Sequence, residues 1–133
     1  MITEDYVSFE VAKLLKEKGF NEPCFYYYKD GVLMFSPILK GRNLYQTDTY
    51  SAPTLQMAMK YLREVHHLYI DVGFGNDYKG EFLYMGDIYD LTKGAIHAEY
   101  EPIIEADDYL STNPKTYEEA CEAAIKYCLE NLI

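Results

Sequence analysis

The most constraining feature of the sequence is residues 51–70, where a helical period changes to a strand period without interruption. Apolar side chains recur there at three- and four-residue spacing, which predicts a helix with one wide apolar face. That face consists of Leu55, Ala58, Met59, Leu62, Val65 and His66. Pro53 fits the start of this helix, and either Ser51 or Thr54 supplies its capping oxygen. From Leu68 onward the apolar residues alternate, as expected of a strand with one face on a core.

A first helix is predicted over residues 4–18, because apolar side chains recur there on one helical face. The stripe consists of Val7, Val11, Leu14 and Leu15. Thr3 and Ser8 are both suitable caps, and the sequence leaves the choice open. Gly19 is placed to adopt the left-handed conformation that ends a helix, which lets Phe20 fold back onto the last turn.

A β-hairpin is predicted over residues 24–35. Asp30 and Gly31 suit a two-residue type I′ turn, in which both central residues need positive φ. Aromatic and β-branched residues flank this turn on both sides. The connection over residues 38–50 has room for a short edge strand at 44–49.

Two further strands, at residues 81–88 and 95–103, follow the central unit and are separated by turn residues. Together these patterns predict one α+β domain over residues 1–133, in the order α-β-β-α-β-β-β-α. Its sheet is expected to be mostly antiparallel, with the helices packed on it. The last two predicted helices share a similar sequence pattern. This leaves open an internal pseudo-repeat that relates residues 1–66 to residues 67–133.

The last helix begins with a capping box, in which Thr116 is the cap and Glu119 follows three residues later. Its buried stripe is predicted to consist of Cys121, Ala124, Ile125, Cys128 and Leu132. Glu122 and Lys126 are expected to pair on the solvent side, because residues four apart are neighbours on a helix.

Composition places the chain among cytoplasmic proteins. It has no run of ~18 uncharged apolar residues that would cross a membrane, and its first residues lack the pattern of a signal peptide. Cys24, Cys121 and Cys128 are an odd number of thiols, so we interpret all three as free thiols. Cys121 and Cys128 lack zinc or redox spacing and are expected in the core, whereas Cys24 is at the start of a strand and has no evident activating base.

The net charge of −10 is unevenly distributed. Residues 1–70 carry eight acids and eight Lys or Arg, whereas residues 71–133 carry fourteen acids and four Lys. This argues against nucleic-acid binding through the second half of the chain, because phosphate contacts need cationic surface. The acidic half is compatible with a basic protein partner, and solubility alone also explains it.

Two groups of residues are candidate metal ligands. The first is His66 and His67 near Asp71, but adjacent helical residues point ~100° apart, so a packed histidine is the favoured interpretation. The second is His97 and Glu99, which share one strand face in a row that Glu101 extends; a solvated polar face explains it equally well. No cofactor and no catalytic set is predicted.

The candidate interaction surface combines an aromatic strand with acidic residues near the C-terminal half. Its members are Tyr26, Tyr28, His97, Glu99, Glu101, Glu105, Asp107 and Asp108. If helices cover only one face of the sheet, the remaining Tyr-rich face is expected to bind a partner or a second copy of the chain. Tyr26, Tyr27 and Tyr28 also suit a stacking platform for single-stranded nucleic acid. Only Lys29, Lys40 and Arg42 lie near them in the sequence, so an ordinary strand surface is the favoured interpretation.

Three stretches are similar in sequence to a family of small uncharacterised proteins encoded by bacteria, their prophages and mobile elements. They are SFEVAKLLKEKGF at 8–20, APTLQMAMKYLREVH at 52–66 and YEEACEAAIKYCLENL at 117–132. Together they cover about a third of the chain. The resemblance implies a phage-related origin. It suggests no activity and no site residues, because none is assigned to the family.

Three hypotheses about function follow. The leading one is a non-enzymatic, phage-related protein-interaction domain that binds a protein or forms a homodimer. The second is an acidic inhibitor or immunity-type protein that occludes a basic site on an enzyme or nucleic-acid-binding protein. The third is a small metal-binding protein or enzyme that uses His97, Glu99 and His66.

Overall fold

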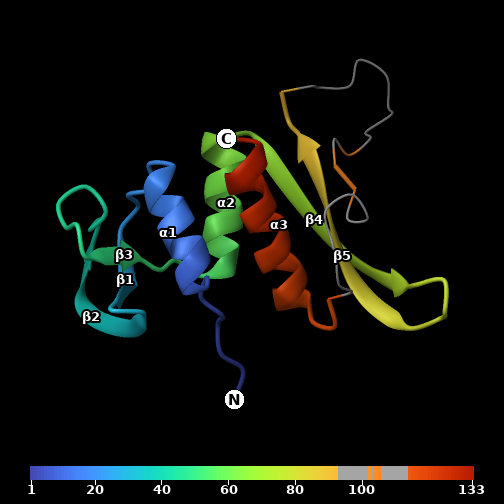
Figure 1. The fold of residues 1–133 in the computed structure, drawn as a ribbon, viewed down its shortest axis with the longest axis horizontal. Coiled ribbons are helices and arrows are strands. Elements are labelled where there is room, and N and C mark those ends of the chain that lie inside the picture. Colours follow the sequence, from blue (N-terminus) through green and yellow to red (C-terminus); the bar gives the residue numbers. More distant parts are fainter. Residues whose placement is uncertain (93–101, 103, 106–113) are drawn as a thin grey trace.

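Three helices lie side by side between two separate antiparallel sheets in this computed structural model (Figure 1). The structure describes residues 1–92, 102, 104–105 and 114–133. These residues fold in the order α-β-β-β-α-β-β-α, which confirms the predicted α+β class. The order differs by one extra strand before the second helix, while the strand expected at 95–103 falls, except for Pro102, outside the described residues.

Helix α1 (Phe9–Glu17) is capped by Ser8, whose Oγ accepts a hydrogen bond from the N–H of Val11 at 3.2 Å. The predicted start at residue 4 was wrong, because the preceding segment is extended and Val7 donates its N–H to the carbonyl of Pro53. The helix ends as predicted. Gly19 has a φ of 91°, and the N–H of Phe20 donates to the Leu15 carbonyl, which is the Schellman arrangement.

The first sheet consists of β1 (Cys24–Lys29), β2 (Val32–Lys40) and β3 (Thr49–Ser51), in the order β2-β1-β3. Its hairpin turn has φ values of 52° at Asp30 and 75° at Gly31, which confirms the predicted type I′ geometry. The short edge strand expected at 44–49 is instead β3, which starts at Thr49 and comes just before the second helix in the sequence.

Helix α2 (Leu55–Val65) begins at Thr54, whose Oγ accepts from the N–H of Met57 at 3.1 Å. Pro53 therefore precedes the cap rather than opening the helix. His67 then adopts a left-handed φ of 58°, unusual for a residue with a side chain, and β4 (Leu68–Asn76) starts at the next residue. This single residue makes the direct helix-to-strand passage that the sequence pattern predicted.

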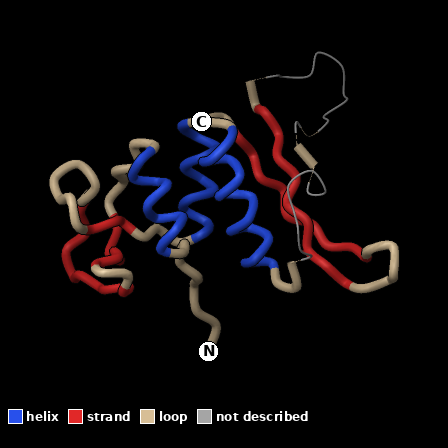
Figure 2. The backbone as a smooth tube through the Cα atoms, viewed as in Figure 1, coloured by secondary structure: helices blue, strands red, loops and turns tan. Residues whose placement is uncertain are grey.

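The second sheet pairs β4 with β5 (Phe82–Asp90) in one continuous antiparallel register. Ile70 and Ile88 lie opposite each other and are buried in the core. Ile88 also forms a bridge with Ile104. The single predicted sheet is thus divided into two, at opposite sides of the helical layer (Figure 2).

Helix α3 (Tyr117–Asn131) lies in the middle of the molecule, against α1, α2 and the β4–β5 sheet. Thr116 Oγ accepts from the N–H of Glu119, as the capping box predicts, but the Glu119 carboxylate accepts from the N–H of Lys115. The fully buried face consists of Ala120, Cys121, Ala124, Ile125, Cys128 and Leu129.

The expected Glu122–Lys126 ion pair is replaced by contacts that each residue makes with other partners. Glu122 accepts from the N–H of Ser8, and Lys126 Nζ lies 3.0 Å from Glu10 and 3.8 Å from Glu130.

Among the described residues, no helix is both long and apolar enough to cross a membrane.

Candidate protein-binding surface

Strand β2, at the edge of the first sheet, exposes large apolar side chains on both sides of Ser36 and Pro37. All six of its large apolar side chains are between 39% and 65% exposed. We call this set the β2 surface: Val32, Leu33, Met34, Phe35, Ile38 and Leu39. Proteins usually protect edge strands with charges, bulges or proline. Here no charged residue lies between Val32 and Leu39, and the protection is limited to Pro37 and a shift in register opposite Phe25.

The inner face of β1 is covered by the N-terminal segment and α1. Tyr28 Oη donates to the carbonyl of Val7 at 2.7 Å, and the rings of Tyr6 and Tyr26 are 4.2 Å apart. Tyr26 and Tyr28, predicted as interaction residues, are therefore half-buried and packed on the core. On β1 only Phe25 is an exposed apolar residue, and the others of this sheet are on the neighbouring strand, where Phe35 lies opposite Tyr26.

The outer face of β1 is covered by the basic loop that follows β2. The Arg42 guanidinium lies 4.2 Å from the centre of the Tyr27 ring, and Arg42 is only 6% exposed. The Asn43 side chain donates to the carbonyl of Phe20 and accepts from the N–H of Ser51. Arg42 is thus part of the packing, which further weakens the nucleic-acid platform that Tyr26 and Tyr28 suggested.

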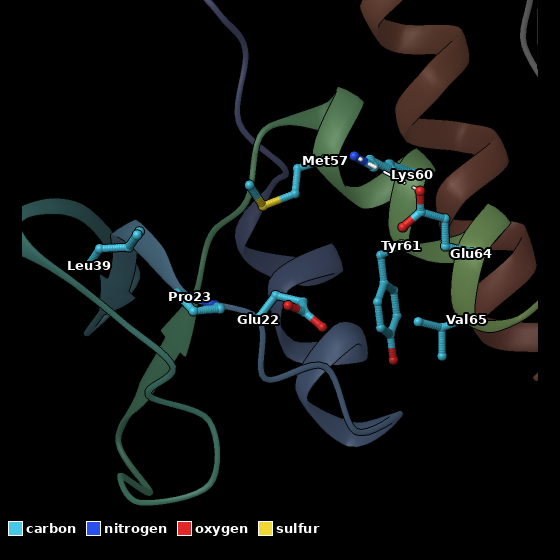
Figure 3. Close-up of a pocket in the computed structure, with 8 residues that line it drawn as sticks. All are labelled: Glu22, Pro23, Leu39, Met57, Lys60, Tyr61, Glu64 and Val65. Atoms are coloured by element: carbon cyan, nitrogen blue, oxygen red, sulfur yellow. Dashed lines mark ion pairs between the residues drawn. The ribbon is translucent and has the colours of Figure 1, made fainter.

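A groove continues from the end of β2 onto α2. We call it the α2 groove; it has a volume of about 360 Å³ and is lined by Glu22, Pro23, Leu39, Met57, Lys60, Tyr61, Glu64 and Val65. Figure 3 shows Leu39 and Pro23 across from the side chains of α2. Leu39 belongs to both the β2 surface and the α2 groove, so the two form one continuous region.

The polar groups in and beside the α2 groove do not form an acid–base set. Burial, and then the charge of Glu22, raises the pKa of Tyr61. Burial, and then His67, lowers the pKa of His66, whose Nε2 lies 3.2 Å from the Tyr61 hydroxyl. Both groups are therefore neutral at pH 7 and hydrogen-bonded to each other. Recognition of an apolar partner segment is the chemistry that this lining supports best.

The metal-ligand candidates are not brought together where the structure describes them. His66 contacts Tyr61, while His67 and Asp71 are exposed. Within the described ranges, no three His, Cys, Asp or Glu residues lie close enough to hold a metal ion. His97, Glu99 and Glu101 lie outside the described residues, as do Asp107 and Asp108.

An acidic area lies on the β4–β5 sheet, away from the β2 surface. Asp71 and Asp87 are direct cross-strand partners, and Glu105 is exposed after the bridge to β5. Burial raises the pKa of Tyr89, and the nearby charges of Asp87, Asp71 and Glu105 raise it further. The sequence analysis named Glu105 as an interaction residue and Asp71 only as a metal candidate, because the register of two strands is needed to place Asp71 opposite Asp87.

The three cysteines are buried free thiols, which confirms the predicted core positions of Cys121 and Cys128 and adds Cys24 to the core. Burial raises the pKa of Cys24 and Cys121 to about 11 and that of Cys128 to about 12. A thiol with such a pKa is a poor nucleophile at neutral pH.

Comparison of the chain with protein-family models, curated proteins and solved structures found no match. The candidate surface therefore depends on geometry alone. Sequence reasoning missed the β2 surface, although one signal was present: residues 32–35 are apolar at every position, whereas a strand with one solvated face alternates.

Proposed function

We propose that this chain is a non-enzymatic protein-interaction domain that binds through the β2 surface and the adjoining α2 groove. The observation that carries the proposal is the exposure of six large apolar side chains on one edge strand. Exposed apolar patches of this kind mark interaction sites. An edge strand also offers unpaired backbone groups to an extended partner segment.

The surrounding chemistry supports a protein partner over other ligands. The α2 groove is open and mostly apolar, with Lys60 and Glu64 paired at 3.9 Å on its rim. Nucleic acid would need accessible cations, and Arg42 is buried.

Capture of partners from a lysate of the native host tests this proposal. We would compare the tagged chain with Phe35→Asp on the β2 surface and Phe74→Asp at the far end of β4. Both phenylalanines are exposed, at 59% and 73%, so the two variants make the same chemical change on opposite sides of the molecule. Partners, including copies of this chain, should be lost with Phe35→Asp and retained with Phe74→Asp. Equal loss or equal retention would contradict the proposal.

A second candidate function, the acidic inhibitor, is favoured by the Asp71–Asp87 pair with Glu105 nearby. These carboxylates give the β4–β5 sheet an acidic surface that complements a basic partner. Binding would then weaken with salt and with Asp71→Asn, and it would not depend on Phe35. Salt-insensitive binding would exclude this candidate.

A further inference from the structure

We infer that the β2 surface is occupied by a second copy of this chain, which pairs its own β2 antiparallel to the first. This inference rests on the proposed function and names its partner. In the resulting homodimer, the two three-stranded sheets join into one six-stranded sheet across a two-fold axis. Such an interface is isologous, because each copy contributes the same residues.

The geometry of β2 suits this self-pairing. Residues Val32 to Phe35 pair regularly with Lys29 to Tyr26 of β1 along one side, and the sheet order leaves the other side of β2 as the edge. Beyond Phe35 the register shifts, and Pro37 has no N–H to donate. The pairing segment is therefore confined to residues 32–35, where every side chain is apolar. When the two copies pair over the full length of this segment, apolar residues meet apolar residues.

The charge distribution favours a second copy over a basic partner at this edge. The β2 surface contains no charged residue, and residues 1–70 are balanced, with eight acids and eight Lys or Arg. Asp71, Asp87 and Asp90 lie on β4 and β5, on the other side of the helical layer from β2 (Figure 1). Two copies joined at β2 therefore keep their acidic sheets far apart, and the long-range repulsion between them is screened.

The β2 surface and the α2 groove together offer a partner more contact area than the strand alone. A specific interface buries about 800 Å² on each partner, which a four-residue strand does not reach. Ile38 and Leu39 extend the apolar area past the pairing segment, and Met57 and Val65 of the α2 groove are also exposed. The dimer is expected to bury this whole region.

Sedimentation equilibrium of the purified full-length chain over a range of concentrations tests the inference. We expect a monomer–dimer equilibrium with a dissociation constant below about 100 μM. Phe35→Asp should raise that constant by roughly 30-fold or more, because it buries a charge at the centre of the interface. Ile38→Lys, at the most exposed side chain of β2, is a second variant that alters little of the fold. Phe74→Asp is the control and should leave the constant unchanged.

A monomer at every concentration would overturn the inference. If that monomer still captures a host protein through Phe35, the proposed function stands and only the choice of partner is wrong. If it captures nothing through Phe35, both fail. A dimer that is insensitive to Phe35→Asp and Ile38→Lys, or one that is lost with Phe74→Asp, would also overturn pairing through β2.

Discussion

The carboxylate of Glu122 accepts a hydrogen bond from the backbone N–H of Ser8 at 3.1 Å, although 114 residues separate them in the sequence. Ser8 is the cap of α1, and Glu122 lies on α3. The bond therefore ties the start of the first helix to the last one. Burial raises the pKa of Glu122, the hydrogen bonds from Ser8 oppose that rise, and the net shift is upward from 4.5.

This shift predicts how Glu122→Gln changes stability with pH. A carboxyl group whose pKa is raised by folding favours the folded state below its unfolded pKa, and that contribution is lost as pH rises through the folded value. Well below pH 4.5 the variant should match the native protein, because Glu122 is then neutral in both states. At pH 7 the variant should be the more stable, since Gln keeps the acceptor without the buried charge. Urea unfolding at both pH values measures this.

Glu118→Gln is the matched control, because Glu118 lies on the same helix and is exposed. It should show a slight loss at pH 7 through the helix dipole. A Glu122→Gln variant that is less stable than the native chain at pH 7 would contradict the assignment.

Gly41→Ala should destabilise the loop that covers the outer face of β1. A Cβ at Gly41 would lie 2.5 Å from the backbone oxygen of Asn21, which cannot move without shifting the chain. We expect a loss of about 1–3 kcal/mol in the free energy of unfolding, as for other overpacking changes. Gly73→Ala is the control, because nothing lies within 4 Å of its Cβ position. Equal losses from the two variants would show that close packing at Gly41 is not the cause.

The three thiols should be protected from modification in the folded protein. Cys24, Cys121 and Cys128 are buried and have pKa values of about 11 to 12. At pH 8 an aromatic disulfide reagent should react with them at least ~100-fold more slowly than in urea, because both access and thiolate fraction fall. Met34→Cys supplies an exposed thiol on β2 as the positive control. One native thiol that reacts as fast as residue 34 would contradict the described core.

Asp71→Asn should stabilise the chain at low salt, because it removes one of two like charges that face each other across β4 and β5. The expected gain in the free energy of unfolding is about 0.2–1 kcal/mol, and it should shrink in high salt. Asp48→Asn makes the same change at an exposed loop position and should have little effect. A gain that persists unchanged in high salt would rule out repulsion as its origin.

Local signals predicted single turns and helix ends well. Asp30 and Gly31 form the expected I′ turn, Gly19 has the expected left-handed φ, and Thr116 caps its helix. Each depends on the conformational preference or capping oxygen of residues within a few positions. The partners of exposed charges were not predictable in this way. Lys126 has a neighbour at i−4, yet its closest ion pair is with Glu10 of another helix.

The predicted interaction surface illustrates the same limit. Tyr26 and Tyr28 have the composition of a binding strand, but the docking of Tyr6, Val7 and α1 covers them. The exposed apolar area lies instead on β2, because only one hairpin strand is paired on both sides.

The sequence by itself determined the elements of this protein: the helix that passes directly into β4, the hairpin of β1 and β2, and the buried stripe of α3. It did so because periodicity, turn residues and caps act over a few neighbouring positions. Only the tertiary structure decided that the strands form two sheets, that Arg42 is buried on Tyr27, and that the β2 surface remains open. These outcomes depend on strand register and helix docking, which are set by contacts between residues far apart in the chain.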